Sequence, residues 1–342
     1  PIYWFRRSRL VGKRMNLIAL AIIMFLVIAA ISISLPSKFL TLINFQSMTS
    51  QIPEFGLLSI AMMIALITGG IDLSVVSITN LTGVVSALIL KTYPGEGSVF
   101  SVIFFAILVA LALSAFCGLI NGFLIAHVGV PAILATLGTM GLYLGTAIII
   151  TEGHGIHTFP EKFLFIGSGT IGILPMPLII LIGATIIIAI ILRKTPLGMS
   201  MFMVGSNPIA SRFSGINNSS ILMQTYIITG LLAGVSSIIM ISRVNSIRPG
   251  YGYAYLLQAI LVAVLGGTDV SGGYGSILGL VLGLIILQSL QSGFNILNFS
   301  PFFRKFIWGL MLLIVMVINY YINRYQSSAR KSRKKVHILS EE

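Results

Sequence analysis

Charge is scarce in this sequence. Only 8% of its 342 residues are charged, with 8 Asp and Glu against 21 Lys and Arg. Soluble domains carry about 25% charged residues, whereas 56% of this chain is hydrophobic. No soluble fold of this length has an interior large enough to bury so much apolar surface. The sequence therefore predicts an all-α, polytopic membrane protein, because helices satisfy their own backbone groups in lipid.

Cysteine and histidine are also rare. Cys117 is the only cysteine, which excludes an intrachain disulfide and a thiolate metal cluster. It lies in an apolar run, so we interpret it as inert packing. The 4 histidines have no metal-ligand spacing, and no metal site is predicted.

Catalytic motifs are missing as well. The chain contains no G-x-x-x-x-G-K-[ST] loop, no G-x-S-x-G elbow and no H-E-x-x-H pair. No catalytic residue is predicted, and the chain has no ATPase site of its own by the phosphate-loop route.

Apolar runs recur along the whole chain. A spanning helix needs about 20 apolar residues, and the run at 255–266 is too short to cross alone. We predict a membrane domain at 15–323 with about ten transmembrane helices, near Met15–Leu35, Phe55–Gly69, Leu73–Leu90, Val99–Ala126, Val130–Thr151, Ile171–Leu192, Ile221–Ile241, Tyr255–Gly266, Tyr274–Leu290 and Phe306–Ile322.

Basic residues gather at both ends of this domain, in segment 1–14 and in the tail 324–342. With both termini in the cytoplasm, 14 Lys and Arg lie on the inner side and 7 on the outer side, which agrees with the positive-inside rule. We interpret the net charge of +13 as orienting charge that also contacts membrane lipid. No folded basic domain points to nucleic acid.

The longest polar interruption is the segment 193–220, which this topology places in the cytoplasm. Asn207 followed by Pro208 is a helix-start signal, with Asn as the N-cap and Pro in the first turn. Apolar residues then recur at helical spacing as far as Ile216. The pattern predicts a short amphipathic helix. It leaves open whether this helix lies on the membrane surface or docks a cytoplasmic protein.

Two short stretches resemble each other, LITGGIDLSVVSITN at 66–80 and AVLGGTDVSGGYGS at 263–276. Glycine-interrupted helices at matching places in two halves are typical of transporters and indicate the translocation path. We therefore take the matched positions as structural or translocation-path candidates: Gly69, Gly70, Asp72 and Ser74 in the first copy, and Gly266, Gly267, Asp269 and Ser271 in the second.

A carboxylate in an apolar region is costly and needs an explanation. The interpretation that we favour is helix capping, in which the glycines end one helix with positive φ and the Asp accepts hydrogen bonds from free amides of the next helix. The alternative is a proton or cation relay through Asp72 and Asp269, which would make the protein an ion-coupled secondary transporter.

An aromatic and basic surface is predicted on the outer side. The stretch RPGYGYAY at 248–255 follows Arg243 and contains Tyr251, Tyr253 and Tyr255. Tyrosines of this kind are most often anchors at the membrane–water interface.

Four stretches together resemble the permease subunits of bacterial ABC importers for ribose, xylose, galactose and autoinducer-2. They are GGIDLSVVSITN (69–80), NGFLIAHVGVPAILATLGTM (121–140), VGSNPIASRFSGIN (204–217) and LGGTDVSGGYGSILG (265–279). The resemblance covers nearly the whole chain in order. Val76, Asp269 and Tyr274 differ from the residues usual in that family.

This resemblance implies a ten-helix subunit of the bacterial cell (inner) membrane that works by alternating access. It implies three partners: ABC ATPase subunits that bind ATP and Mg, a second permease copy or paralogue, and an extracytoplasmic sugar-binding protein. No cofactor is expected in this chain. The segment 193–220 becomes the coupling loop, with matched positions at Gly205, Asn207, Ala210, Ser214 and Gly215. A receptor or scaffold without solute flux is a third possibility.

Overall fold

The computed structural model describes residues 2–92, 98–318 and 321. The helices are α1 (Ile2–Ser34), α2 (Pro36–Phe39), α3 (Leu42–Ile67), α4 (Val75–Lys91), α5 (Val99–Phe123), α6 (Ala132–Thr151), α7 (Glu161–Ser168), α8 (Met176–Lys194), α9 (Pro196–Ser206), α10 (Pro208–Phe213), α11 (Asn218–Val244), α12 (Ala254–Leu265) and α13 (Ile277–Ile296). A π-helical turn, Leu124–Val128, extends α5, and a last described helix covers Pro301–Ile318. The basic tail 324–342 lies outside the described residues.

Within the described residues, 8 helices are long and apolar enough to cross a membrane. They confirm the predicted all-α, polytopic fold. The two other predicted spans correspond to α4 and α12, which are shorter apolar helices. Neither reaches the length of about 20 residues that crosses a bilayer alone, so their passage across the membrane stays a prediction.

The helix α3 begins earlier than the sequence predicted. We expected a start at Phe55, but the helix starts at Leu42, where Thr41 is the N-cap and its hydroxyl accepts from the Asn44 amide. The prediction was wrong because polar residues at 46–51 lower the local hydropathy. Polar side chains on a membrane helix normally face neighbouring helices; here Thr49 is buried, whereas Gln46 and Ser47 are exposed.

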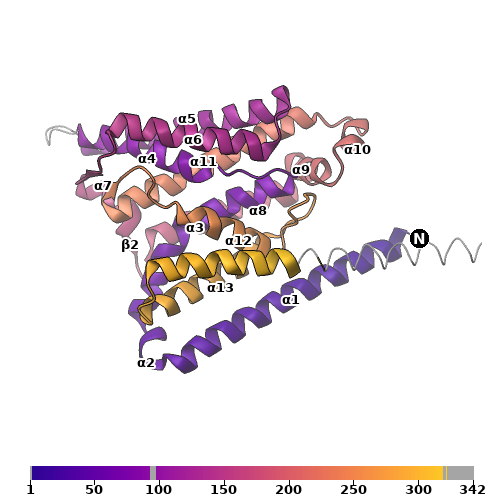
Figure 1. The fold of residues 1–342 in the computed structure, drawn as a ribbon, viewed down its shortest axis with the longest axis horizontal. Coiled ribbons are helices and arrows are strands. Elements are labelled where there is room, and N and C mark those ends of the chain that lie inside the picture. The colour runs from indigo at the N-terminus through magenta and orange to yellow at the C-terminus, as the bar shows by residue number, and fades with distance from the viewer. Residues whose placement is uncertain (1, 93–97, 319–320, 322–342) are drawn as a thin grey trace, which may run out of the picture.

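Helices α3 and α11 form much of the interior. The best 18-residue window of α3 is 83% buried and that of α11 is 67% buried, whereas the windows of α1 and of Pro301–Ile318 are each 6% buried. Helix α11 packs against α3, α4 and α5, and α12 packs against α3 and α13. Figure 1 shows α3, α11 and α12 in the middle, with α5 and α6 along one side and α1 along the other.

The helices lie roughly side by side, so the molecule has two ends (Figure 1). We call one the α10 end, because α9, α10 and the N-terminus lie there, and the other the α7 end, where α7 and α2 lie. At the α7 end two short antiparallel ribbons tie loops together: β1 (Ile156–His157) pairs with β4 (Ser246–Ile247), and β2 (Thr170–Ile171) pairs with β3 (Leu174–Pro175).

Candidate functional site

The first glycine pair ends α3 as the sequence predicted. Gly69 has φ +80°, a conformation that favours glycine. Its amide donates to the Leu66 carbonyl at 2.9 Å, and the Gly70 amide donates to the Ala65 carbonyl at 3.1 Å. This pair of hydrogen bonds is the Schellman arrangement, which satisfies carbonyls at a helix C-terminus.

The second copy ends α12 by the same means, but one residue later. Here the second glycine, Gly267, has φ +84°. Its amide donates to the Val264 carbonyl, and the Thr268 amide donates to the Ala263 carbonyl, both at 3.0 Å. Gly266 instead permits close packing, because a Cβ on it would lie 2.7 Å from Leu280 Cα. The two copies therefore share a turn but not an exact residue alignment.

The end of α9 is wedged between these two loops. A Cβ on Gly205 would lie 1.9 Å from the Ile67 carbonyl oxygen and 2.6 Å from the Gly273 nitrogen. The Gly273 amide donates to that same Ile67 carbonyl at 2.8 Å. A Cβ on Gly272 would lie 2.8 Å from both Gly69 Cα and the Gly205 carbonyl oxygen. We call Gly69, Gly205, Gly272 and Gly273 the glycine junction.

The glycine junction joins three chain segments through backbone contacts. Real Cβ atoms essentially never approach other atoms within 3.0 Å, so only glycine fits at Gly205 and Gly272 without displacement. Close-packed interiors do not deform continuously. The end of α9 is therefore in direct backbone contact with the loops that follow α3 and α12.

The predicted coupling segment, 193–220, contains two short helices, α9 and α10, where we expected one. Residues that we predicted as loop form α9, because Thr195 caps it and Pro196 stands in its first turn. The predicted start of α10 is confirmed: Asn207 Oδ1 accepts from the amides of Ile209 and Ala210, each at 3.0 Å, and Pro208 is the first helical residue.

The other predicted coupling positions end α10. The Ser214 hydroxyl donates to the Ala210 carbonyl at 3.0 Å, and Gly215 has φ +81°. Asn218, at the start of α11, holds α10 in place: its side-chain amide donates to the Pro208 carbonyl at 2.8 Å. This short helix is thus fixed to α11 at one side and joined to the glycine junction at the other.

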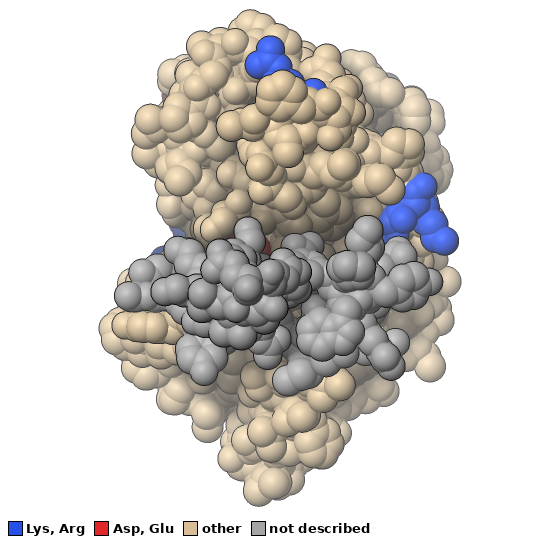
Figure 2. Space-filling model, turned by 90° about the vertical axis from the view of Figure 1, so that its right-hand side faces the viewer, with Lys and Arg blue, Asp and Glu red and all other residues tan. Residues whose placement is uncertain are grey.

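Apolar side chains on α10 point away from the protein. Phe213 is 90% exposed and Ile209 is 71% exposed, and Met199 on α9 is 66% exposed. Figure 2 looks onto this end of the molecule; in the described surface that it shows, Lys and Arg lie toward the rim and uncharged residues form most of the face. An exposed apolar cluster with a polar rim is typical of a contact surface.

Asp72 lies in a buried polar cluster. Its side chain has no exposed surface. One carboxylate oxygen accepts from the Ser74 amide at 3.1 Å and the Ser74 hydroxyl at 2.7 Å, and the other accepts from the Thr229 hydroxyl at 2.8 Å. The Asn121 amide donates to the Ser74 hydroxyl at 2.7 Å. The predicted capping role is wrong, because Ser74 and not Asp72 is the N-cap residue of α4, and no side-chain capping hydrogen bond forms there. The carboxylate instead ties the segment before α4 to α5 and α11.

Two atoms beside this cluster have no hydrogen-bond partner among the described residues, Asn121 Oδ1 and the Tyr226 hydroxyl. A Cβ on Gly70 would lie 2.4 Å from that hydroxyl oxygen. A side chain at position 70 would overlap the Tyr226 hydroxyl. Glycine is therefore needed there for steric reasons, although the φ of Gly70 is not positive.

Asp269 does not have the role that we predicted. It accepts from the Ser271 amide at 2.9 Å, an exposed contact within its own loop, and Ser271 is itself exposed. The next helix is capped by Ser276, whose hydroxyl accepts from the Gly279 amide. The prediction was wrong because Gly272 and Gly273, both with positive φ, insert another turn before α13.

An ion pair in the interior was missed by the sequence reasoning. Glu54 on α3 is completely buried, and its carboxylate accepts from Arg243 on α11 and, at 2.6 Å, from the Tyr255 hydroxyl on α12. The predictions of Arg243 as an outer-surface cation and Tyr255 as an interfacial anchor were wrong. A lone Glu in a long apolar run was the available signal, since buried charges are normally paired.

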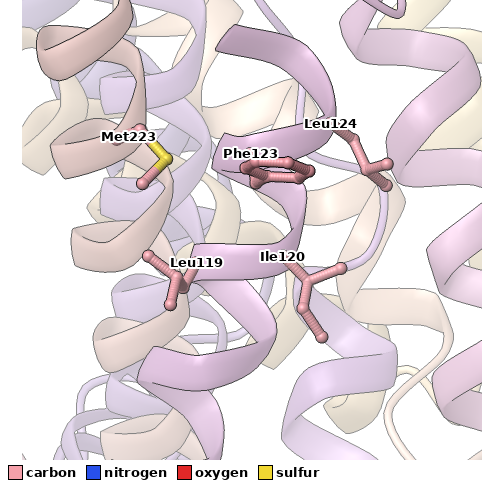
Figure 3. A pocket seen from close by; sticks show the side chains of 5 residues that line it. All are labelled: Leu119, Ile120, Phe123, Leu124 and Met223. Carbon is pink, nitrogen blue, oxygen red and sulfur yellow. The ribbon is translucent and has the colours of Figure 1, made fainter. Parts of the chain in front are cut away.

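One pocket in the described part of the chain is lined by apolar side chains alone. It has a volume of about 260 Å³ and is lined by Leu119, Ile120, Phe123, Leu124 and Met223. Figure 3 shows these side chains on α5, its π-helical extension and α11. A lining without polar groups suits a lipid acyl chain and offers nothing to hydrogen-bond a polar solute.

The comparisons with known proteins agree with this architecture. Residues 44–316 match the model of a family described as the permease component of the branched-chain amino acid transport system. No solved structure matches.

The curated relatives are import permeases. The ribose import permease protein RbsC of Bacillus subtilis (strain 168) is 33% identical over 86% of this chain and 90% of its own length. The L-arabinose transport system permease protein AraH of Escherichia coli (strain K12) is 29% identical over 86% and 87%. The autoinducer 2 import system permease protein LsrD of Yersinia enterocolitica is 30% identical over 79% and 81%. The chain therefore belongs to this permease family and is a multi-pass protein of the bacterial inner membrane.

Proposed function

We propose that this chain is the permease subunit of an ATP-binding-cassette importer for a sugar or a sugar-like solute. The observation that carries this proposal is the similarity, over 79–87% of the chain, to relatives named as ribose, arabinose and autoinducer 2 permeases. These names do not favour the ion-coupled alternative. The unlike surroundings of Asp72 and Asp269 speak against a paired relay as well.

The α10 end is cytoplasmic in this proposal, as the excess of basic residues in segment 1–14 and in the tail requires. The exposed apolar side chains of α10 are then the docking surface for the ATPase subunit. Docking of a short helix on a partner needs exposed anchors, and Phe213 and Ile209 supply them. The glycine junction passes the resulting movement to the ends of α3 and α12.

The remaining partners follow from the same proposal. A second permease copy or a paralogue completes the pathway within the domain 15–323, and an extracytoplasmic sugar-binding protein delivers the solute at the α7 end. ATP and Mg²⁺ bind to the ATPase subunits, so this chain supplies no cofactor site. Its own task is to move the helices around the pathway.

Reconstitution tests this function. The chain is placed in proteoliposomes with the ATPase and binding protein encoded beside it, and uptake of labelled D-ribose and L-arabinose is measured with and without ATP. We expect uptake that needs ATP and stops when the phosphate-loop lysine of the ATPase is replaced. Uptake driven by a proton or sodium gradient without ATP contradicts the proposal.

The docking surface has its own test. Phe213→Ala removes an interface anchor, so we expect ATPase binding to weaken about 30-fold, as for a hot-spot residue worth ~2 kcal/mol. Because Phe213 is 90% exposed, the free energy of unfolding of the isolated chain should change by less than about 0.5 kcal/mol. Phe302→Ala is the matched control, since Phe302 is 80% exposed but lies outside α10. Equal ATPase binding by both variants excludes α10 as the docking surface.

A further inference from the structure

The segment that leads into α12 is not helical. Residues 249–253 lie between β4 and α12 and form turns. Gly250 has φ +82° and Gly252 has φ +75°, whereas every residue of a right-handed helix has a negative φ. Helix α12 has 12 residues, fewer than the roughly 20 that cross a bilayer alone. In the predicted crossing, the 249–253 loop therefore spans the depth that α12 leaves uncovered.

Two side-chain contacts show how deep this loop lies. The Asn80 side-chain amide donates to the Tyr251 carbonyl at 2.8 Å, and the Tyr253 hydroxyl donates to Met140 Sδ at 3.5 Å. At 1.5 Å per residue, Asn80 lies about 8 Å from the start of α4 and Met140 about 12 Å from the start of α6. The loop thus reaches the middle of the helices, which differs from the interfacial position that the sequence predicted for Tyr253.

The described part of the chain does not enclose this loop. Tyr253 is 45% exposed, and a Cβ on Gly250 would meet nothing within 4 Å. Non-helical backbone at membrane depth does not face lipid; it is buried in protein or lines a water-filled cavity. In the assembled transporter, the exposed side of the loop therefore faces another subunit or water.

Helix α6 leaves room beside Tyr253. Met140, which contacts the Tyr253 hydroxyl, stands between Gly138 and Gly141 in the sequence of α6. Both glycines are exposed, and a Cβ on either of them would meet nothing within 4 Å. A solute or a partner helix can therefore approach Tyr253 from this side.

Tyr253 offers a solute two kinds of contact. The face of its ring is electron-rich and attracts C–H groups, which cover the faces of a sugar ring. Its hydroxyl can donate and accept, and its contact with the Met140 sulfur is weak, because a thioether is a weak acceptor. A ring compound with C–H faces and hydroxyl edges is the class of solute that this side chain matches best.

We infer that Tyr253 lines the aqueous translocation pathway and that its ring stacks against the passing sugar. The inference rests on the proposed function and adds a solute contact to it. A pathway between two permease subunits is lined by the outer surface of each chain and not by its interior. Tyr253 and the open side of α6 belong to that surface, so the second copy or paralogue supplies the opposite wall.

Substitutions at Tyr253 separate the ring from the hydroxyl. In proteoliposomes with the ATPase and binding protein, Tyr253→Ala should lose about tenfold of its D-ribose or L-arabinose uptake, whichever the wild type transports, because an aromatic contact is lost. Tyr253→Phe keeps the ring and should stay within twofold of the wild type. Both variants should keep the wild-type melting temperature, since the side chain is partly exposed.

Phe25→Ala is the control for this experiment. Phe25 is an aromatic residue that is 70% exposed on α1, on the other side of the molecule from α6 (Figure 1). Its replacement should leave uptake unchanged. Uptake by Tyr253→Ala within twofold of the wild type overturns the inference. An equal loss in Tyr253→Ala and Tyr253→Phe overturns it as well, because the hydroxyl and not the ring would then carry the contact.

Thiol labelling gives a second readout that needs no solute. In the assembled transporter, Tyr253→Cys should react with a charged, membrane-impermeant thiol reagent about tenfold faster than Phe25→Cys or more, because a thiol that faces lipid does not form the reactive thiolate. The wild type, whose Cys117 is buried, gives the background. Equal rates for the two variants mean that no water reaches the loop, and they overturn the inference. If the wild type shows no ATP-dependent uptake, the proposed function fails, while the labelling still decides whether Tyr253 meets water.

Discussion

At its α10 end, α3 meets the loop after α12 through backbone atoms, with the Gly273 nitrogen 2.8 Å from the Ile67 oxygen. At its other end, the same helix meets α13 through side-chain amides, with Gln288 Nε2 3.5 Å from Gln51 Oε1. Glycine at the first contact leaves no side chain to rearrange, whereas the amides of the second can turn and exchange partners.

The difference shows that α3 has one end held by rigid backbone packing and one end held by side-chain contacts that can rearrange. Close backbone packing transmits displacement, because interiors at native density are not compressible. Amides with free acceptors can be solvated by water or by hydroxyl groups, because their present bonds are weak. The ion pair of Glu54 lies between these regions and keeps α3, α11 and α12 in register.

The largest expected effect is at that ion pair. Glu54→Gln leaves Arg243 without its carboxylate, and breaking a buried pair costs about 3–5 kcal/mol. We expect a corresponding loss of thermal stability in detergent, measured by differential scanning fluorimetry. The double variant Glu54→Gln/Arg243→Gln should recover most of that loss, since no charge is left unpaired. Equal melting temperatures for Glu54→Gln and the wild type would show that the ion pair does not stabilise the contacts between α3 and α11.

A slightly smaller effect is expected at the glycine junction. Gly205→Ala places a Cβ against the Ile67 carbonyl, and overpacking of this kind costs about 3 kcal/mol. Gly138→Ala is the matched control: a Cβ there meets open space, and Ala stabilises a helix relative to Gly by about 0.5–1 kcal/mol. The melting temperatures of Gly205→Ala and Gly138→Ala, measured by thermal unfolding, test this prediction. If Gly205→Ala is as stable as the control, the junction is not close-packed.

The two aspartates should differ by a smaller margin. Asp72→Asn weakens three hydrogen bonds in a buried cluster and should cost about 1–3 kcal/mol. Asp269→Asn changes an exposed contact and should cost less than about 0.5 kcal/mol. Chemical denaturation of the two variants makes the comparison. Similar losses of unfolding free energy in the two variants would mean that Asp72 and Asp269 have equivalent roles, as the sequence repeat suggested.

The smallest effect is a coupling between two residues. Gly70→Ala should be destabilising because its Cβ meets the Tyr226 hydroxyl. In the Tyr226→Phe background the same change should cost about 1 kcal/mol less, since contacting residues couple by about 0.5–3 kcal/mol. A double-mutant cycle of melting temperatures measures this value. Strict additivity would mean that the hydroxyl does not fill the space left by Gly70.

Local signals predicted local structure well. The Asn-Pro start of α10 and the glycine turn after α3 were predicted because their causes lie within a few residues of chain. The same reasoning failed at Asp269, where two additional glycines lengthen the loop, and at Leu42, where polar residues obscured half of α3. In both places the deciding features lie within the same segment, the positive φ of Gly272 and Gly273 and the Thr41 cap, but the repeat and the hydropathy concealed them.

The sequence by itself determined that this chain lies in a membrane, that it is helical, and to which permease family it belongs. Composition and motif order are enough for these, because lipid admits few apolar architectures. Only the tertiary structure decided that Gly205 separates two loops, that Glu54 pairs with Arg243 and that the glutamines of three helices meet. Those contacts join residues that lie between 33 and 237 positions apart in sequence. Helical periodicity specifies which face of a helix is polar but not which helix it faces.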